Sequence, residues 1–399
     1  MSAPGGDTLI EGRCDPPFTG VREEFRRNFV ERGEVGASLS VRLRGEAVVD
    51  LWGGLADPAT GRGWERDTVC VVFSSTKGAL ALLAHLMATS GELDLSWPVS
   101  KIWPEYAQAG KGGTTVSMLL DHSAGVPVLR DPVKDDALLD WDYMVGRLEA
   151  ETPWWEPGTV HGYHPLTFGF TVGEVLRRVG GMDLGDLLRT RLAEPLGLDF
   201  WLGLPAEIEP RVAPILPATS RPDPSPFQTA VRHERGSIPN LFAFNSGTWP
   251  RTGFNSRAGH LAQIGAAGGI TNGRGLSGLY AAAAVPGEGP LPFDRITLAQ
   301  MAQPFRKGDD RTLLVPTRFS QGFMLAVDNR AGFGQGCSVR MGPQAFGHIG
   351  SGGSFGFADP EHGLSVGYAM NQQGSGLLGN ERGEALVEQI YSSLGAPLH

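Results

Sequence analysis

The sequence predicts an α+β fold, in which an antiparallel sheet flanked by helices is built from both ends of the chain and joined to a mainly helical lobe. Three observations indicate this fold. Alternating β-rich runs occur near the amino terminus, helical patterns and loops fill the middle, and β-like runs return near the carboxyl terminus. Strands contributed by both ends of a chain are expected to share one sheet around a common core.

The first predicted strands lie on either side of a short turn. The runs "ASLSVRL" and "AVVDLWGG" are separated by "RGE", and their alternating pattern predicts a β-hairpin. After Ser74 comes "KGALALLAHLMATSGEL", in which leucine and methionine recur at helical spacing and Gly91 acts as a stop. This run predicts a helix that begins close to Ser74.

The remainder of the chain alternates between helical and β-like patterns. "TVGEVLRRVGG" and "LGDLLRTRLAEPLGL" predict amphipathic helices, whereas residues 214–227 contain five prolines and predict an irregular loop, either a wall of a site or a plain connector. Strand-like runs lie at 319–327 and begin again at 345 and 364, and Asn380 is the expected cap of a final helix. We therefore expect a discontinuous sheet domain, a helical domain and an active site between them, with the sheet domain at 1–89 and 236–399 and the helical domain at 90–235.

Composition excludes several classes of protein. The 399 residues carry a net charge of −9, which argues against binding to nucleic acid or to an anionic membrane surface. No apolar run approaches the length of a membrane span, and "MSAPGGDTLIEGRCDPPF" lacks the pattern of a secretory signal. The three cysteines, Cys14, Cys70 and Cys337, are far apart and predict reduced thiols in the cytoplasm. No metal-ligand spacing or cofactor motif occurs, and the oligomeric state is not indicated.

A serine and a lysine stand one helical turn apart in "VVFSSTKGAL". Of 34 lysines and arginines only five are lysines, and Lys77 alone follows a serine, Ser74, at a distance of three residues. Residues i and i+3 lie on one face of a helix, so the two side chains can meet. Apolar neighbours lower the pKa of a lysine, which allows it to take a proton from a hydroxyl group. The pattern predicts a nucleophile and its base.

Two further stretches fit the same chemistry. Tyr163 in "WEPGTVHGYHPLTFGF" follows a Pro-Gly turn, and its hydroxyl could relay the proton of the nucleophile. His348 lies in the glycine-rich run "FGHIGSGGSFGF", where a backbone can approach a ligand closely. The order of S-x-x-K, tyrosine and glycine-rich strand resembles the serine β-lactamase and penicillin-binding-protein superfamily. The resemblance to family VIII carboxylesterases is stronger and extends over most of the chain, including "LWGG", "LLDHSAGVP", "FNSRAG", "GGITNGRGLSGLY" and "GYAMNQ".

The resemblance implies a β-lactamase-like fold and a carboxylesterase of the EC 3.1.1 class that acts through a serine acyl-enzyme on small or short-acyl esters. It implies that Ser74 is the nucleophile and that Lys77 and Tyr163 move the proton. The backbone N–H groups of Ser74 and Ser351 would form the oxyanion hole beside Gly350. His348 replaces the lysine of the lactamase Lys-Thr-Gly motif, and a histidine provides a weaker cation for a lactam carboxylate at neutral pH.

A proline also departs from the lactamase pattern. Lactamases place an asparagine two residues after the tyrosine, where this chain has Pro165. Both departures favour esters over lactams. The alternatives are a β-lactamase, a D-amino-acid peptidase or amidase, or an acyltransferase of the same fold, and an inactive penicillin-binding-like scaffold that binds a ligand.

Other candidate residues are weaker. Ser354 satisfies G-x-S-x-G, but the sequence after it does not predict the helix that a nucleophile elbow needs. His122 is expected to be structural and to shape the floor of the site. His161 and His164 flank Tyr163 and could tune it or lie exposed in a loop. Trp154 and Trp155 would line an acyl pocket or belong to the core.

Overall fold

The computed structural model describes residues 9–219, 225–287 and 290–398 and contains one large sheet and a short two-stranded ribbon. The amino-terminal strands are β1 (Ile10–Cys14), β2 (Gly36–Leu43), β3 (Glu46–Asp57), β4 (Arg62–Gly63) and β5 (Cys70–Val71). The later strands are β6 (Ile270–Thr271), β7 (Arg306–Asp309), β8 (Pro316–Phe319), β9 (Met324–Leu325), β10 (Phe346–Ile349), β11 (Phe355–Asp359) and β12 (Leu364–Met370).

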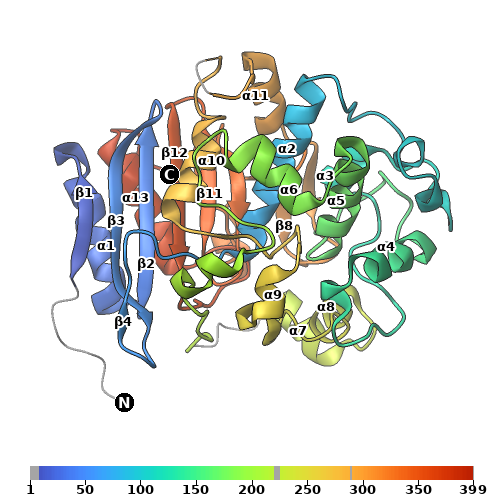
Figure 1. Ribbon diagram of the computed structural model, residues 1–399, viewed down its shortest axis with the longest axis horizontal. Helices are drawn as coiled ribbons and strands as arrows, with labels where there is room; N and C mark the ends of the chain where they lie inside the picture. Colours follow the sequence, from blue (N-terminus) through green and yellow to red (C-terminus); the bar gives the residue numbers. More distant parts are fainter. Residues whose placement is uncertain (1–8, 220–224, 288–289, 399) are drawn as a thin grey trace.

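The large sheet is antiparallel and joins the two ends of the chain, as the sequence predicts. Among the described residues its order is β1-β3-β2-β12-β11-β10-β9-β8-β7, with β4 paired to the end of β3. The two halves meet where β2 pairs with β12, with Leu39 opposite Tyr368. In Figure 1 the blue strands therefore lie beside the red ones. Burial of Leu39, Val41, Val366 and Tyr368 anchors this junction in the core.

The predicted hairpin is confirmed as β2 and β3. Its turn consists of Arg44 and Gly45, which both have positive φ angles, of 51° and 84°. Such a pair of left-handed residues makes the turn whose twist matches that of two antiparallel strands. Glycine takes this conformation without strain, which explains the glycine at the second turn position.

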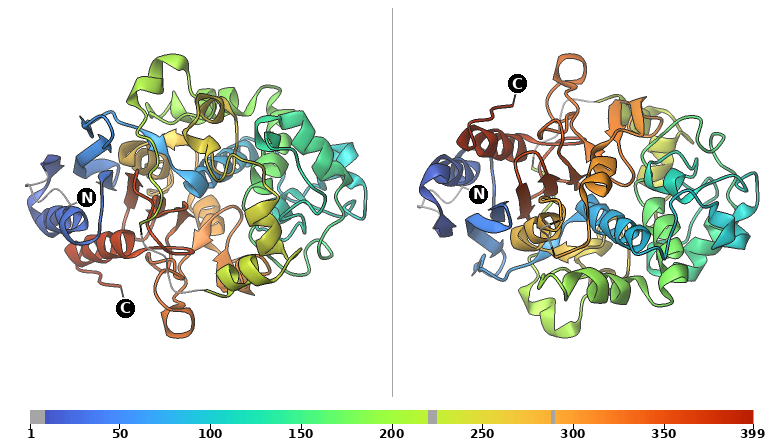
Figure 2. Two further views of the ribbon diagram at one scale, coloured as in Figure 1. Left: turned by 90° about the horizontal axis from the view of Figure 1, so that it is seen from below. Right: turned by 90° about the horizontal axis from the view of Figure 1, so that it is seen from above.

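Helices cover both faces of the sheet. The α-helices are α1 (Thr19–Glu31), α2 (Thr76–Thr89), α3 (Val116–Leu120), α4 (Trp141–Ala150), α5 (Thr167–Gly180), α6 (Leu184–Leu188), α7 (Pro226–His233), α8 (Ile238–Phe244), α9 (Arg257–Leu261), α10 (Gly273–Ala281), α11 (Arg295–Ala302), α12 (Arg330–Phe333) and α13 (Glu381–Ser393). Helices α1 and α13 pack together on one face, and α10 packs on the other (Figure 2). The final helix begins at Asn380, whose side chain accepts the N–H of Gly383, as predicted for a cap.

Helix α10 lies very close to the sheet because glycines face it. A Cβ on Gly367 of β12 would come within 2.3 Å of the carbonyl oxygen of Gly273, and one on Gly356 of β11 within 2.6 Å of the Tyr280 ring. Larger residues at these two positions would push α10 away from the sheet. The sheet face therefore fixes the position of α10, and β6, which directly precedes α10, pairs with β5.

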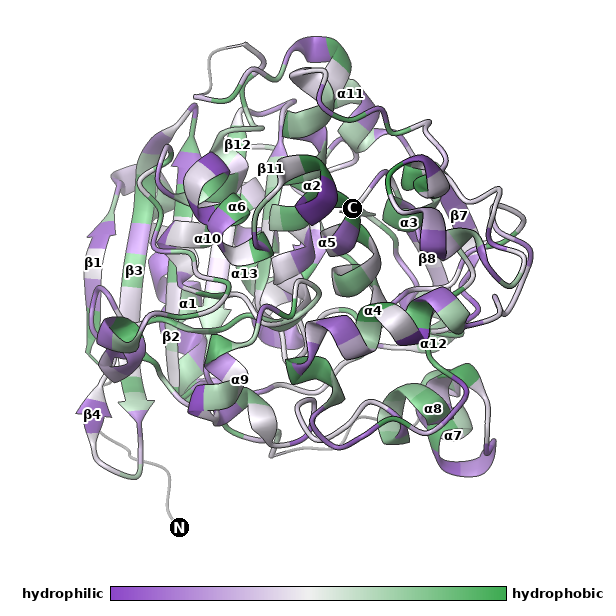
Figure 3. Ribbon diagram, turned by 45° about the vertical axis from the view of Figure 1, so that its right-hand side comes forward, coloured by the Kyte–Doolittle hydropathy of each residue, from purple (hydrophilic) through white to green (hydrophobic). Residues whose placement is uncertain are grey.

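The helix predicted after Ser74 is α2, and it forms the centre of the molecule. Eleven of its residues are buried, including Lys77, and hydrophobic segments are visible along it in Figure 3. It packs against α5 and α6, on the side away from β1. A helix that is apolar on all sides is a core helix, so Lys77 is held where water is excluded.

The proline-rich loop and the two expected domains are described only in part by the structure. Of the loop predicted at 214–227, residues 214–219 contain no helix or strand and residues 220–224 lie outside the described residues, as does the start of the amino-terminal segment. The prediction is wrong at the end of the loop, where Pro226 and Phe227 begin α7. None of the described helices is long and apolar enough to cross a membrane. The boundaries of the two expected domains remain a proposal, and α7 and α8 pack against each other across residue 236.

Candidate active site

Ser74 lies in a strained turn between a strand and the central helix. Strand β5 ends at Val71, and a 3₁₀ turn, Phe73–Ser75, leads directly into α2. Phe73 has φ +45°, a left-handed conformation that costs a non-glycine residue free energy and is found at functional turns. The ring of Phe73 packs edge-on against Trp249 and Phe254, which holds this conformation. The turn leaves Ser74 partly exposed while its neighbours are buried.

Lys77 is brought to Ser74 by the predicted three-residue spacing. Its Nζ atom lies 3.2 Å from Ser74 Oγ. Nζ also donates to the main-chain oxygens of Pro165, at 2.8 Å, and of Ala266, at 2.9 Å. A neutral amine has two hydrogens and one lone pair. With both hydrogens directed at carbonyl groups, the lone pair remains for the Ser74 hydroxyl.

The surroundings of Lys77 favour this neutral form. Burial lowers the pKa of Lys77 well below its usual value, because an ammonium group loses its hydration there. Its contacts are main-chain oxygens and the rings of Tyr163 and Phe168, whose centroids lie 4.7 Å and 5.8 Å from Nζ. In the described part of the chain no carboxylate forms an ion pair with it. Lys77 can therefore accept a proton.

Tyr163 is held beside Lys77 by its main chain. Its N–H donates to both carboxylate oxygens of Asp310, each at 3.0 Å. Its ring stacks on Phe319, with the centroids 6.0 Å apart. Burial raises the pKa of the Tyr163 hydroxyl, an effect that Ser74 opposes. Tyr163 is therefore a protonated phenol next to Ser74, which suits it to donate a proton.

The segment after β10 lies across the hollow from Ser74 and carries the main-chain N–H group of Ser351. Ser351 lines the same hollow as Ser74, and its N–H has no acceptor among the described residues. Ser74 itself lies in the first turn of its 3₁₀ segment, where amides lack acceptors within the helix. The Gly350 amide, by contrast, donates to the oxygen of Ser354 at 2.7 Å. A Cβ on Gly350 would come within 2.3 Å of Val72 O, which explains the glycine.

His348 lies behind this wall rather than on its surface. Its side chain is buried, and it is not among the residues that line the hollow around Ser74. Its ring is 5.9 Å from that of Tyr163, and its pKa is lowered well below the usual value chiefly by burial. The neutral ring therefore lies beside Tyr163 and does not supply a cation to a ligand in the hollow.

The hollow at Ser74 has a volume of about 270 Å³ and an apolar wall. No charged side chain of the described residues lines it. The large apolar residues in its lining are Phe73, Leu166, Phe227, Phe242, Trp249, Leu313, Met324, Ile349, Leu377 and Leu378. An uncharged apolar ligand fits such walls, whereas an anion would lose its hydration without gaining a partner. Below, this space is called the active-site hollow.

Three further histidines lie near Tyr163, and all are buried and neutral. The N–H of His164 donates to His122 Nδ1 at 3.1 Å, and the His122 ring lies 4.9 Å from that of Tyr163. Burial lowers the pKa of His122 well below its usual range and that of His164 to about 3. His161 is buried too and contacts Thr317, so none of these histidines lies exposed in a loop.

The two tryptophans do not line the active-site hollow. Trp154 packs against the Arg130 guanidinium group, and its Nε1 donates to Val128 O. Trp155 Nε1 donates to Ser123 O. Both tryptophans are partly buried, lie outside the hydrophobic core and fix the loop that carries His122, so they have neither the acyl-pocket role nor the core role expected from the sequence.

Ser354 does not have the surroundings of a nucleophile. It is buried, its Oγ donates to Val72 O at 2.8 Å and lies 3.3 Å from Ser75 Oγ. Strand β11, not a helix, follows it. Ser354 thus ties the glycine-rich segment to the turn before Ser74.

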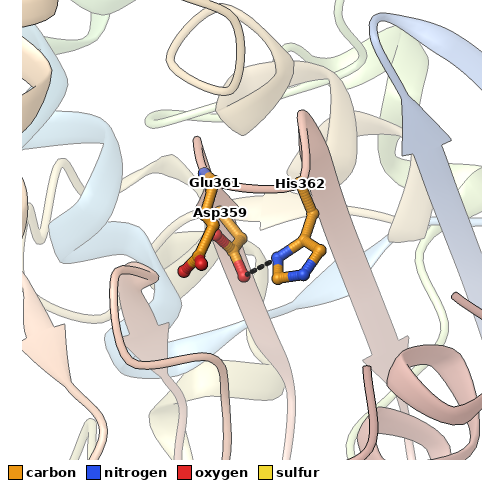
Figure 4. A group of neighbouring side chains, drawn as sticks. All are labelled: Asp359, Glu361 and His362. Carbon is orange, nitrogen blue, oxygen red and sulfur yellow. Dashed lines mark hydrogen bonds and ion pairs between the residues drawn. The ribbon is translucent and has the colours of Figure 1, made fainter. Parts of the chain in front are cut away.

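One group of acidic and histidine side chains has the spacing of metal ligands. Asp359, Glu361 and His362 lie together in the turn between β11 and β12 (Figure 4). Oδ2 of Asp359 already accepts the Tyr391 hydroxyl at 2.6 Å and lies 3.0 Å from His362 Nδ1, and Oδ1 accepts the Glu361 N–H. These bonds explain the cluster as a turn-fixing network, apart from the active-site hollow.

Sequence reasoning missed the groups that act through the main chain. The carbonyl groups of Pro165 and Ala266 orient Lys77, but a main-chain acceptor has no signature in the sequence. Asp310 holds Tyr163, yet in "GDD" it looks the same as its neighbour Asp309. Only the fold shows that Asp310 is buried and Asp309 exposed.

The fold is an antiparallel sheet joined to helices, and its site holds a serine one helical turn before a buried, neutral lysine. Together these two features define the class of β-lactamase-like serine hydrolases. The chain belongs to the Beta-lactamase family, whose model matches residues 23–389. It is 34% identical over 382 residues to the esterase/beta-lactamase LipL of Mycobacterium tuberculosis, covering 92% of this chain and 84% of the relative.

Two solved structures show the same fold at similar identity. A family VIII carboxylesterase superposes with a TM-score of 0.84 at 37% identity, covering 96% of this chain and all of that chain. A penicillin-binding-protein homologue from Caulobacter crescentus gives a TM-score of 0.85 at 36% identity, covering 97% of this chain and all of that one. The family predicted from the sequence motifs is thereby confirmed.

Proposed function

We propose that the protein is a carboxylesterase that cleaves small or short-acyl esters through an acyl-enzyme on Ser74. The observation that carries this proposal is the position of Lys77: a buried neutral amine 3.2 Å from Ser74 Oγ. Relatives named as a family VIII carboxylesterase and an esterase/beta-lactamase support ester cleavage as the reaction.

The acylation step uses the groups around Ser74 in turn. Ser74 Oγ attacks the ester carbonyl carbon while Lys77 Nζ takes the hydroxyl proton. The carbonyl oxygen becomes negative and is stabilised by the N–H groups of Ser74 and Ser351. The carbon–oxygen bond to the alcohol then breaks, and Tyr163 gives its proton to the leaving oxygen and regains one from Lys77.

Deacylation repeats these steps with water in place of Ser74. Lys77 accepts a proton from a water molecule, which attacks the acyl carbon. The bond to Ser74 Oγ breaks, the proton returns to Oγ, and a carboxylic acid leaves. No step requires a metal ion or an organic cofactor.

The lining of the active-site hollow supports esters over β-lactams. A penicillin carries a carboxylate that needs a cation, whereas the hollow is apolar and His348 is buried and neutral. We expect kcat/KM for p-nitrophenyl butyrate to exceed that for benzylpenicillin by about 10³ or more, which corresponds to roughly 4 kcal/mol of transition-state stabilisation.

A second activity on amides is the alternative within the same fold. The name of the Mycobacterium tuberculosis relative includes β-lactamase, and D-amino-acid peptidase or amidase and acyltransferase reactions would use the same acyl-enzyme. Steady-state rates with p-nitrophenyl butyrate, a chromogenic cephalosporin and a D-amino-acid amide separate these reactions. Penicillin hydrolysis as fast as ester hydrolysis would overturn the esterase assignment and leave Ser74 as the nucleophile.

An inactive ligand-binding scaffold is the alternative of another class. The neutral Lys77 beside Ser74 argues against it, because a scaffold needs no base. Mass spectrometry after exposure to a serine-directed phosphonate should show one adduct on Ser74 and none in Ser74→Ala. An unlabelled wild-type protein would favour the scaffold.

The cellular location belongs to the same proposal. The three cysteines, Cys14, Cys70 and Cys337, are all free, which supports a reducing compartment such as the cytoplasm. Cell fractionation tests this, and recovery of the protein outside the cytoplasm would contradict it.

A further inference from the structure

A second and larger hollow lies apart from the active-site hollow. Its volume is about 560 Å³, and the two spaces share no lining residue. Its walls come from the β2–β3 turn, the segment before β5, the loop at residues 196–199 and one face of α10. In the text below it is called the arginine hollow, after Arg42, Arg44, Arg66 and Arg274 in its lining.

Small residues on α10 keep the arginine hollow open. Gly275, Gly278, Ala281 and Ala282 line it at helical spacing, so apart from Arg274 this face of α10 carries no bulky side chain. A Cβ on Gly278 would come within 2.5 Å of Leu198. The neighbouring loop therefore sits close to the helix, while the space beside it remains free for a ligand.

The charges around this space do not balance. Arg274 forms an ion pair with Asp50 at 3.0 Å. The two carboxylates in the lining, Asp67 and Asp199, are both engaged by Arg211. Arg42, Arg44 and Arg66 remain, and their positive charge is concentrated around the arginine hollow, although the net charge of the protein is −9.

Three guanidinium groups lack a carboxylate partner within the described chain. Arg42 donates to Gly45 O at 3.2 Å and lies 3.4 Å from Ser277 Oγ, which fixes its position. The guanidinium groups of Arg44 and Arg66 form no hydrogen bond or ion pair with any described residue, and both residues are exposed. Like charges held close together repel one another, so an anion between them would relieve an unfavourable interaction.

We propose that the arginine hollow binds a small multivalent oxyanion, a phosphorylated or polycarboxylate molecule. A guanidinium group presents paired N–H donors that match the geometry of phosphate and carboxylate oxygens. Arg274 is already paired with Asp50, so the three guanidinium groups without a carboxylate partner select ligands with at least two negative charges. The volume exceeds that needed by inorganic phosphate and admits a ligand with an organic part.

The position of the arginine hollow relates it to Ser74 through the β5–β6 ribbon. In this antiparallel pair Cys70 faces Thr271 and Val71 faces Ile270. At one end of the ribbon Arg66 and Arg274 line the arginine hollow, and at the other Ser74 and Ala267 line the active-site hollow. A ligand held by Arg66 and Arg274 therefore bridges the two strands that lead to the nucleophile.

Calorimetry tests the proposal directly. Pyrophosphate and citrate, titrated into the wild-type protein at 0.15 M ionic strength, should each bind with one site per chain, and the tighter of the two indicates whether phosphate or carboxylate is preferred. Arg44→Gln/Arg66→Gln should weaken binding about tenfold or more, while kcat/KM for the ester stays unchanged. Arg235→Gln removes an exposed arginine without a described partner elsewhere and should leave binding unchanged.

Hydrogen exchange then locates the ligand. Pyrophosphate should slow exchange in residues 42–46, 66–72 and 270–278 and leave residues 349–353 unchanged. Three outcomes overturn the proposal: no binding of either anion by the wild-type protein, wild-type affinity in the double variant, or protection centred on 349–353.

Discussion

Lys77 Nζ lies 3.2 Å from Ser74 Oγ, and its two other hydrogen bonds go to main-chain carbonyl groups. This arrangement directs the lone pair of a neutral amine at the serine. It depends on burial, which lowers the pKa of Lys77, and on two acceptors that mutation of side chains does not remove.

Lys77 should give the protein a pH-dependent stability. In the folded state the pKa of Lys77 is lowered well below its usual value, whereas in the unfolded state it is about 10.4. Between these two pKa values the lysine is neutral when folded and charged when unfolded, so the unfolded state binds one more proton. The free energy of unfolding therefore rises with pH in that window, by up to about 1.4 kcal/mol per pH unit relative to Lys77→Met.

Chemical denaturation of the wild type and Lys77→Met at pH 8, 9 and 10 measures this difference. Lys101→Met, which removes an exposed lysine, controls for the loss of one positive charge. A constant difference between wild type and Lys77→Met across these pH values would mean that Lys77 is charged in the folded protein, and the base would have to be sought elsewhere.

Ser74→Ala should abolish ester hydrolysis while the fold persists. Removal of a member of a catalytic unit costs about 10³-fold or more in kcat. Ser354→Ala is the matched control, since Ser354 is a buried serine of the same region that bonds to Val72 O. It should lower Tm, because one buried hydrogen bond is worth about 1 kcal/mol, and should keep most of the activity. The reverse pattern of activities would transfer the nucleophile to Ser354.

Lys77→Ala and Tyr163→Phe should each lose most activity, and the double variant should be little worse than either single variant. Groups that move one proton in a common step give non-additive losses. Burst and steady-state kinetics with p-nitrophenyl butyrate measure all three variants. Losses that multiply would show that Tyr163 acts independently of Lys77, for example by packing alone.

The large features of the fold could be predicted because they depend on local patterns. The hairpin follows from alternation on both sides of Arg44 and Gly45, and helix α2 from leucine spacing and Gly91. The contact between Ser74 and Lys77 also follows from local geometry, since three residues make one turn. Family motifs supplied Tyr163, which lies nearly ninety residues further along the chain.

The remaining parts of the site depend on contacts between distant segments. Phe242 and Leu378 line the active-site hollow, yet nothing in either segment marks them for it. His348 stands in the expected motif, but its burial behind the hollow depends on the packing of β10 against α2. Burial of a polar residue is set by tertiary packing, which single-sequence patterns do not encode.

Asp310 offers the clearest test of such a hidden residue. Its carboxylate accepts the N–H groups of Tyr163, Thr312 and Leu313 and the hydroxyl of Thr317, at 2.8–3.0 Å. Asp310→Ala leaves three buried N–H groups without an acceptor, each costing about 1–3 kcal/mol, so we expect a loss of about 3 kcal/mol or more in stability.

Asp310→Ala should also lower kcat in the protein that remains folded, beyond the activity lost through unfolding. Release of the Tyr163 main chain would displace its hydroxyl from Ser74, and a shift of about 1 Å can cost 10²-fold in rate. We therefore expect kcat of Asp310→Ala, measured well below its Tm, to fall about tenfold or more. Asp310→Asn should be milder, because one amide oxygen can keep the three N–H bonds while the Thr317 hydroxyl turns to accept. Asp309→Ala, which changes the exposed neighbour, should alter neither the free energy of unfolding nor kcat. A wild-type kcat in folded Asp310→Ala would show that Tyr163 needs no anchor at its main chain.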